Sequence, residues 1–337
     1  MFNKENCDLC GSCLVSCAYV DYSREKAFKE MRALIDNSEA EILRDCITCF
    51  ACNEYCEKGA NPFDLISALQ EKTGAISPAP QVSGMFEQII GSPSSITRGD
   101  PSKPVLSLCA IEPFIRPDLI QSEIFRGMTM ARGGDYFCYY AMLHVGKAGM
   151  LPEKARTFAR NIQNLGSGEI VFLHEECYAM VRKMKSQWDI EVPFKATSIL
   201  EHLNRYLREN RSRIKPIGKQ IAYQRPCSSR EIPETEWLLQ DFFELVGVEQ
   251  IKRKYEGKDA LCCGAAIMGL GQFDRAMGIV KKNMEDILSH GPDALVYLCP
   301  FCGYSLSEPC MAHHLPAVFI ADLARMALGE IPFPGKG

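Results

Sequence analysis

The stretch Ala-Leu-Val-Tyr-Leu-Cys-Pro-Phe-Cys, residues 294–302, joins an apolar run directly to a C-x2-C pair. A short apolar run with β-branched and aromatic residues, ended by a proline, is typical of a buried strand in a parallel sheet. A related stretch, Ile-Val-Phe-Leu-His-Glu-Glu-Cys, occupies residues 170–177. Both runs lead into side chains that bind metals, so the sequence indicates two related units with ligand-bearing loops.

The two units keep the same register over a long distance. Cys138 and Cys177 are 39 positions apart, and so are Cys263 and Cys302. Helical patterns lie between the apolar runs, which predicts βαβ units with parallel sheets. We expect strands at 105–108, 170–173, 221–223 and 294–298, and helices at 153–165 and 273–289.

The second unit carries five cysteines close to its predicted strands. Parallel sheets gather ligands at the carboxyl ends of their strands, so we expect these cysteines to share one face. They are Cys227, Cys262, Cys263, Cys299 and Cys302. A cubane cluster needs four thiolates, so a fifth either bridges or stays reactive. Gly264 removes a side chain beside the adjacent pair. The alternative interpretation is a zinc site with one spare thiol.

The N-terminal part repeats a four-cysteine run, C-x2-C-x2-C-x3-C, which is the spacing used for [4Fe–4S] clusters. In two-cluster ferredoxins the fourth cysteine of each run serves the other cluster. We therefore expect one cluster on Cys7, Cys10, Cys13 and Cys56, and a second on Cys46, Cys49, Cys52 and Cys17. A pair of zinc sites is the alternative, although zinc sites rarely use this run twice. Residues 22–44, between the runs, read as a helix with Phe28, Met31, Leu34 and Ile35 on one face.

Composition sets the broad class of protein. The chain has 337 residues, 47% of them hydrophobic, and a formal charge of −4, which argues against nucleic acid as a main partner. We expect a cytoplasmic protein with no transmembrane segment of its own, because no long apolar run and no secretory signal is visible. In a reducing compartment, seventeen cysteines indicate metal ligands or redox thiols rather than disulfides.

The N-terminal module, with its helix between the two runs, resembles the α-helical ferredoxin of succinate dehydrogenase iron–sulfur subunits and heterodisulfide reductases. The five-cysteine pattern resembles the CCG domain of heterodisulfide reductase catalytic subunits. Related domains occur in iron–sulfur subunits of glycolate, lactate and anaerobic glycerol-3-phosphate oxidoreductases. The order of the domains along the whole chain is similar to that of the fused heterodisulfide reductase subunit. The implied fold class is an α-helical ferredoxin-like domain followed by α/β, with two pseudo-symmetric CCG repeats containing parallel sheets.

The resemblance also implies domain limits and cofactors. Residues 1–75 would form the α-helical ferredoxin with two [4Fe–4S] clusters. Composition rather than resemblance predicts a linker at residues 76–103, because the chain becomes rich in Pro, Ser and Gly there, with a helical turn at the apolar stretch 85–90. Residues 104–215 would form a degenerate CCG repeat, and residues 216–337 a complete one with a noncubane [4Fe–4S] cluster. The five cysteines of the complete repeat would be both the ligands and the catalytic residues of that cluster.

The first repeat departs from the family pattern. Phe137 replaces the first cysteine of the pair, Tyr139 replaces the glycine, and His174 replaces the first cysteine of C-x2-C. A candidate metal site remains on Cys109, Cys138, His174 and Cys177. Three cysteines and a histidine form a legitimate zinc set and could also hold an iron–sulfur cluster. The third alternative is a repeat that holds no metal and is retained only for packing.

The resemblance implies an oxidoreductase subunit of anaerobic metabolism. Electrons would pass from the ferredoxin-type clusters to the noncubane cluster, which would reduce a disulfide or exchange electrons with a thiol or quinone pool. The alternative is a non-catalytic electron relay subunit of a flavin-dependent 2-hydroxy-acid or glycerol-3-phosphate dehydrogenase. Implied partners are a flavoprotein, a hydrogenase, a formate dehydrogenase or a membrane quinone or cytochrome subunit, which would supply any membrane association. Glu175 and Glu176 would be proton donors if buried beside a cluster, and otherwise a solvated pair.

Overall fold

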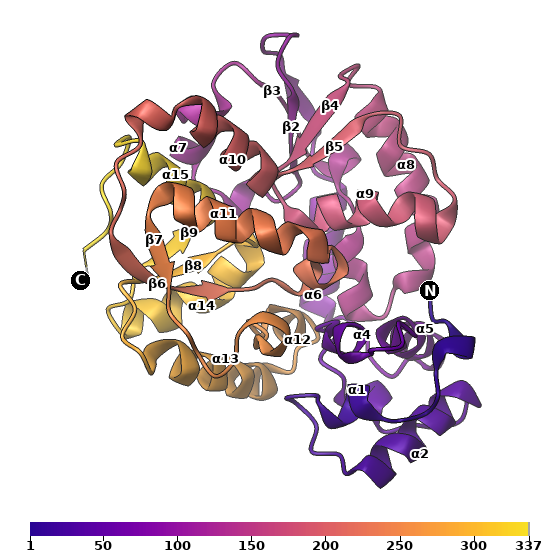
Figure 1. The fold of residues 1–337 in the computed structure, drawn as a ribbon. Helices are drawn as coiled ribbons and strands as arrows, with labels where there is room; N and C mark the ends of the chain where they lie inside the picture. Colours follow the sequence, from indigo (N-terminus) through magenta and orange to yellow (C-terminus); the bar gives the residue numbers. More distant parts are fainter. Residues whose placement is uncertain (336–337) are drawn as a thin grey trace.

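A computed structural model describes residues 1–335. Three parts follow one another along the chain: a small helical module at the N-terminus, drawn in indigo in Figure 1, and two α/β halves, each with its own sheet. The α/β class and the parallel sheets predicted from the sequence are confirmed.

The N-terminal module consists of short helices because its cysteine loops interrupt the chain. The helices are α1 (Ser12–Val15), α2 (Arg24–Ile35), α3 (Ile42–Asp45), α4 (Ala51–Tyr55) and α5 (Pro62–Thr73).

The single helix predicted over residues 22–44 is wrong, because two helices occupy this stretch. The Ser23 hydroxyl accepts a hydrogen bond from the Lys26 N–H and starts α2, and Asn37 takes a left-handed conformation (φ 54°) that ends it. The buried face of α2 also differs from the predicted one, because Met31 and Leu34 are buried whereas Phe28 is exposed.

The segment after this module is more ordered than a linker with one helical turn. It holds α6 (Pro80–Ile90) and β1 (Ser95–Thr97), and β1 pairs antiparallel with a strand of the first half. Pro80 lies in the first turn of α6, where proline has no hydrogen bond to lose and its fixed φ favours the helix. Pro80 therefore starts a helix within the segment that was expected to be a linker.

The first half alternates strands and helices. Its elements are β2 (Val105–Cys109), α7 (Pro117–Ile120), β3 (Thr129–Arg132), α8 (Leu151–Gln163), β4 (Glu169–Phe172), α9 (Glu175–Trp188), β5 (Lys195–Ser198) and α10 (Ile199–Glu209). The sheet order is β1-β3-β2-β4-β5, and all pairs except β1–β3 are parallel.

The second half follows the same path. Its elements are β6 (Lys219–Gln224), α11 (Glu236–Val246), β7 (Val248–Gln250), α12 (Ala265–Gly269), α13 (Phe273–Leu288), β8 (Ala294–Tyr297), α14 (Pro300–Ala312), β9 (Ala317–Phe319) and α15 (Ile320–Ala327). The order β7-β6-β8-β9 is entirely parallel and matches β3-β2-β4-β5 strand for strand. The strands and helices expected from the apolar runs are confirmed in both halves.

The carboxyl ends of the central strands of both sheets lead to the candidate ligand residues. Cys109 is the last residue of β2, and His174 precedes α9 directly after β4. Cys227 follows β6, and Cys299 precedes α14 directly after β8. One apolar core joins the parts, because Phe50 and Phe63 of the N-terminal module pack in the same cluster as residues of both sheets.

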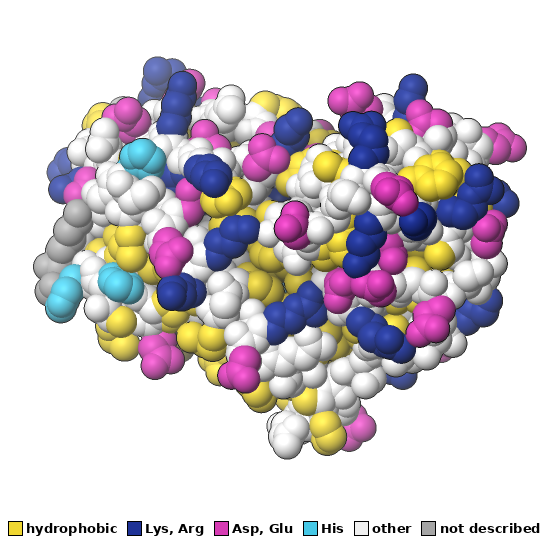
Figure 2. All heavy atoms as spheres, turned by 90° about the horizontal axis from the view of Figure 1, so that it is seen from below, with side chains coloured by type: hydrophobic (Ala, Val, Ile, Leu, Met, Phe, Trp, Pro, Cys, Tyr) yellow, Lys and Arg dark blue, Asp and Glu magenta, His cyan; other side chains and the backbone are white. Residues whose placement is uncertain are grey.

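Within residues 1–335, no helix combines the length and apolar character needed to cross a bilayer. Figure 2 shows the molecule from below, where Lys and Arg side chains are interspersed with Asp and Glu and with hydrophobic side chains. Charges of both signs are therefore mixed over this face.

Candidate metal centres

The first N-terminal set gathers around a surface cavity. Cys7, Cys10, Cys13 and Cys56 line a hollow of about 250 Å³. Burial, with the neighbouring thiols of Cys56 and Cys10, raises the pKa of Cys13 to about 12. The Ala60 N–H donates to Cys56 Sγ at 3.4 Å. The last cysteine of the second run thus lies among those of the first, as the crossed assignment requires.

The second N-terminal set lies deeper. Burial and then the Cys49 thiol raise the pKa of both Cys17 and Cys46. The pKa of Cys52 is also raised by burial and by its neighbours Cys46 and Cys49. The Thr48 N–H donates to Cys46 Sγ at 3.3 Å. Cys17 of the first run therefore belongs spatially with the second run.

The two cysteine loops share one backbone geometry. Leu9 (φ 61°) and Gly11 (φ 72°) flank Cys10 in left-handed conformations, and Thr48 (φ 58°) and Phe50 (φ 63°) flank Cys49 in the same way. This sequence of conformations turns the chain tightly around a central point and aims successive backbone N–H groups inward. Such a loop suits an anionic, sulfur-rich group.

The five C-terminal cysteines converge from three loops. Cys227 begins the 3-10 helix η8 (Cys227–Glu231), Cys262 and Cys263 precede α12, and Cys299 and Cys302 lie at the start of α14. Two thiols, those of Cys262 and Cys302, donate hydrogen bonds that lower the pKa of Cys263 against the effect of burial.

Contacts among the other thiols complete this five-cysteine site. The Cys302 thiol, whose one S–H is shared between Cys263 and Cys299, and then His174 lower the pKa of Cys299 to about 5 against the effect of burial. Burial is the main reason that the pKa of Cys227 is raised, and Cys299 and Cys263 add to the effect. The Gly264 N–H donates to Cys262 Sγ at 3.3 Å. The five thiols therefore lie near one another.

Side chains of the first half form the opposite wall of this site. Glu175 and Glu176 are 2% and 4% exposed, so the solvated-pair interpretation is wrong. Burial raises the pKa of Glu175 to about 8, although the Ser229 hydroxyl donates to it at 2.9 Å. Burial also raises the pKa of Glu176, whose Oε2 has no hydrogen-bond partner among the described residues.

His144 belongs to the same wall and was not identified from the sequence. Its Nε2 lies 3.6 Å from Cys227 Sγ, and its Nδ1 lies 2.9 Å from Thr48 Oγ1. The Thr48 hydroxyl donates to the Ile47 carbonyl, so its oxygen accepts a hydrogen bond from His144 Nδ1–H. His144 thereby links the second N-terminal set to the five-cysteine site. Nothing in the spacing of residues 48, 144 and 227 indicates this contact.

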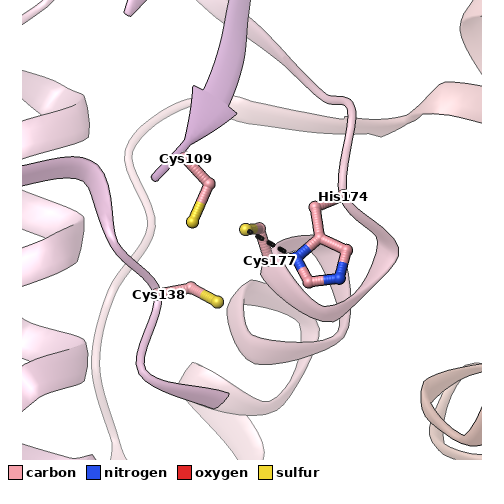
Figure 3. Close-up of side chains that lie close together, drawn as sticks. All are labelled: Cys109, Cys138, His174 and Cys177. Atoms are coloured by element: carbon pink, nitrogen blue, oxygen red, sulfur yellow. Dashed lines mark hydrogen bonds between the residues drawn. The ribbon is translucent and has the colours of Figure 1, made fainter. Parts of the chain in front are cut away.

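The first-half candidate set is compact and fully buried (Figure 3). The ligand atoms of Cys109, Cys138, His174 and Cys177 all lie within 4.8 Å of one another. Burial raises the pKa of Cys138 and of Cys177, whereas hydrogen bonds from these two thiols lower the pKa of Cys109 despite its burial. The four side chains predicted from the repeat register are thus brought together.

The N-terminal module touches the five-cysteine site directly. The Tyr19 hydroxyl accepts a hydrogen bond from the Cys262 N–H at 2.6 Å, and Lys282 Nζ donates to the Ala18 carbonyl at 2.8 Å. Cys49 lies close enough to Cys262 and Cys227 to raise the pKa of both. The cysteine sets therefore follow one another from the surface cavity to the interior.

The chemistry and spread of the donors distinguish two kinds of site. Among residues 1–335, the only compact group of ligand atoms with more than one thiol is the first-half set. Four ligands around one zinc at about 2.3 Å lie about 4 Å apart, which fits that set. The ligand atoms of the N-terminal sets and of the five-cysteine site are spread more widely and are all thiols. This spread suits iron–sulfur clusters, because the thiolates that hold such a cluster bind several irons rather than one ion.

Comparisons with known proteins agree with this donor chemistry. A family model described as "CCG: Cysteine-rich domain" matches residues 221–307, which contain all five C-terminal cysteines. One subunit of the dihydromethanophenazine:CoB–CoM heterodisulfide reductase of Methanosarcina acetivorans is 23% identical, over 81% of this chain and 75% of the relative. The corresponding protein of Methanosarcina barkeri is 22% identical, over 88% and 81%.

Two further proteins are similar over most of the chain. One subunit of the fumarate reductase (CoM/CoB) of Methanothermobacter marburgensis is 22% identical, over 95% of this chain and 71% of the relative. A hypothetical protein from Helicobacter pylori has a similar fold, with a TM-score of 0.59 and 13% identity, and the match covers 89% of this chain and 64% of that protein's length. The CCG domain and the similarity to reductase subunits over most of the chain support a protein of the heterodisulfide reductase family.

Proposed function

We propose that this chain is the iron–sulfur electron-transfer subunit of a heterodisulfide-reductase-like enzyme. Residues 1–75 would form its ferredoxin domain, residues 76–103 the connection, and residues 104–215 and 216–337 the two CCG repeats. Its partners would be other redox subunits, because the relatives are named as subunits of reductases.

The observation that carries this proposal is the serial arrangement of three all-thiol sets. The first set lines a surface cavity, the second lies behind it, and Cys49 of the second lies close to Cys227 and Cys262 of the third. Bound clusters would supply one-electron transfer between the surface and the five-cysteine site. Cys7, Cys10, Cys13 and Cys56 would hold the first [4Fe–4S] cluster, Cys46, Cys49, Cys52 and Cys17 the second, and Cys227, Cys262, Cys263, Cys299 and Cys302 the noncubane one.

The chain's own groups prepare the five-cysteine site for a disulfide. Reduction of a disulfide takes up two electrons and two protons and releases two thiols. The buried carboxyl groups of Glu175 and Glu176 lie in the same wall and can hold protons there. The Gly264 N–H hydrogen bond withdraws charge from Cys262 Sγ.

A hollow beside the five-cysteine site offers a path for substrate. It has a volume of about 1380 Å³ and is lined by Phe114 and Arg116 from the first half and by Met268, Pro300 and Gly303 from the second. Pro300 lies within the C-x2-C motif at the start of α14, and Gly303 directly follows that motif. A small disulfide is therefore the substrate class that this position favours.

The first-half set supports a second candidate function. Its compact geometry favours one zinc ion over an iron–sulfur cluster. The first half thus lacks the set of five thiols that the second half carries. A chain with a single five-cysteine site could act as a relay in a flavin-dependent 2-hydroxy-acid or glycerol-3-phosphate dehydrogenase. Co-purification of a flavoprotein in fixed stoichiometry, without disulfide turnover, would select this function.

Thiol-dependent electron paramagnetic resonance separates the two functions. Protein purified without oxygen is mixed with a small thiol under oxidising conditions. A disulfide reductase gives a new paramagnetic signal, because the thiolate binds the oxidised five-cysteine centre. An unchanged spectrum with all iron retained would exclude disulfide chemistry and leave the relay.

A further inference from the structure

His174 stands between two cysteine sites. It directly precedes α9, and Cys299 directly precedes α14, with nearly the same backbone conformation: φ −93°, ψ 123° for His174 and φ −95°, ψ 125° for Cys299. The two residues thus occupy equivalent positions in the two halves. They also meet, because His174 Nε2 lies 3.6 Å from Cys299 Sγ.

The two ring nitrogens of His174 face different sites. Nδ1 lies 4.0 Å from Cys177 Sγ, on the side of the first-half set (Figure 3). Nε2 faces Cys299 and lies 3.9 Å from Glu176 Oε2, which is too long for an N–H···O hydrogen bond. The Phe301 ring holds the imidazole from the side, with ring centroids 5.7 Å apart at 66°. The side chain is 2% exposed, so neither nitrogen turns to water.

The position of the imidazole proton follows from this placement. A neutral imidazole carries one proton, and what binds one nitrogen fixes the state of the other. A metal ion held by Cys109, Cys138 and Cys177 would take the lone pair of Nδ1. The proton would then lie on Nε2, where Cys299 Sγ is the acceptor within reach.

We propose that His174 links the two sites: its Nδ1 completes a single-metal site with three cysteines, and its Nε2–H donates a hydrogen bond to Cys299. This inference rests on the proposed function in one respect, namely that Cys299 binds a redox cluster. The N–H dipole stabilises the more negative, reduced state, so it raises the midpoint potential of the C-terminal centre. His174 is thus a positioning residue. Through it, the metal of the first-half set raises the midpoint potential of the C-terminal centre.

Two substitutions separate the parts of this proposal. His174→Cys keeps four ligands for the metal but removes the N–H donor to Cys299. Cys138→Ala weakens the metal site but keeps the imidazole. His202→Gln is the matched control, because His202 is a buried histidine of the first half that touches neither site. Zinc and iron are quantified in each oxygen-free preparation. The midpoint potential of the C-terminal centre is measured by a redox titration that is followed by electron paramagnetic resonance.

We expect one zinc in the wild type and in His174→Cys, and loss of zinc in Cys138→Ala. Both variants should lower the midpoint potential of the C-terminal centre, whereas His202→Gln should leave it unchanged. Wild-type protein prepared in zinc-depleted medium should show the same downward shift without any substitution, which covers the case of a variant that does not fold. An unchanged potential in His174→Cys or in zinc-depleted protein, with C-terminal iron intact, would overturn the link. Wild-type protein without C-terminal iron would instead contradict the proposed function.

Discussion

Glu54 accepts hydrogen bonds from Arg225 at 2.7 Å and 3.0 Å, across the boundary between the N-terminal module and the second half. Arg230 pairs with the same carboxylate. Both arginine side chains are 4% exposed, and the two guanidinium groups keep the pKa of Glu54 below its usual value although burial works against the charge. These arginines flank Cys227, so they fasten the N-terminal module beside the five-cysteine site.

Removing the Glu54 charge should loosen this boundary. Glu54→Gln removes the carboxylate that the two buried guanidinium groups share and leaves Arg225 with Glu236 alone. We expect a cost of about 3 kcal/mol, at the lower end for breaking a buried ion pair. Chemical unfolding should show the loss, and limited proteolysis should cut earlier near residues 74–104. Glu57→Gln, three positions on and exposed, is the control and should change neither measurement. Equal behaviour of the two variants would show that the ion cluster does not hold the module in place.

Replacing one C-terminal ligand should remove one cluster and spare the others. Cys299→Ser takes a thiolate from the five-cysteine site, so iron should fall from about 12 to about 8 atoms per chain. Cys310→Ser is the matched control, because Cys310 is buried against Met284 and belongs to none of the cysteine sets. Iron analysis after anaerobic desalting measures the difference. Retention of all iron in Cys299→Ser would contradict the assignment of this cysteine.

Acid should destabilise the chain through a histidine outside the metal centres. His202 Nε2–H donates to the Ile124 carbonyl at 3.3 Å, and Nδ1 is buried without a partner among the described residues. Burial lowers the pKa of His202 to about 4, so the unfolded chain binds a proton between about pH 6.5 and 4 that the folded chain does not. Stability therefore falls as pH drops through that window, by roughly 3 kcal/mol in all.

The control for this pH dependence is the exposed His290. His202→Gln should flatten the stability profile between pH 6.5 and 4, as measured by urea unfolding at several pH values. In His290→Gln, the unfolding free energy should change with pH as steeply as it does in the wild type. A wild-type slope in His202→Gln would show that other groups cause the acid sensitivity.

Glycine is required after the adjacent cysteine pair. Gly264 has φ +84°, and a Cβ there would lie 3.1 Å from the Ala276 carbonyl oxygen and from Val280. Gly264→Ala should cost about 1–2 kcal/mol from the left-handed conformation alone and should reduce iron retention at the five-cysteine site. Gly278→Ala lies in α13 with open space around it and should stabilise the protein by about 0.5–1 kcal/mol. Thermal unfolding of both variants compares a required glycine with a dispensable one.

The sequence predicts those parts of the structure that follow from local patterns. Buried strands such as 294–297 are apolar throughout, and each cysteine run encodes its own loop. The register of Cys138 and Cys177 with Cys263 and Cys302 is sufficient to predict the two matching sheets and the compact first-half set.

Other features depend on tertiary contacts or on single backbone conformations. His144 joins Thr48 to Cys227 across three separate segments, and no local pattern encodes such a contact. Tyr139 takes the left-handed conformation (φ 61°) that Gly264 takes in the second half. The first repeat therefore has the same backbone conformation at this position as the second, although tyrosine stands in place of glycine. Asn37 ends a helix whose apolar pattern continues, because one left-handed residue outweighs that pattern.

The most direct test of the account is the metal and sulfide content of wild-type protein purified without oxygen. Two cubane clusters and one noncubane cluster predict about 12 iron atoms and about 12 acid-labile sulfides per chain. A colourless preparation with zinc in place of iron and no acid-labile sulfide would contradict the assignment of all three all-thiol sets.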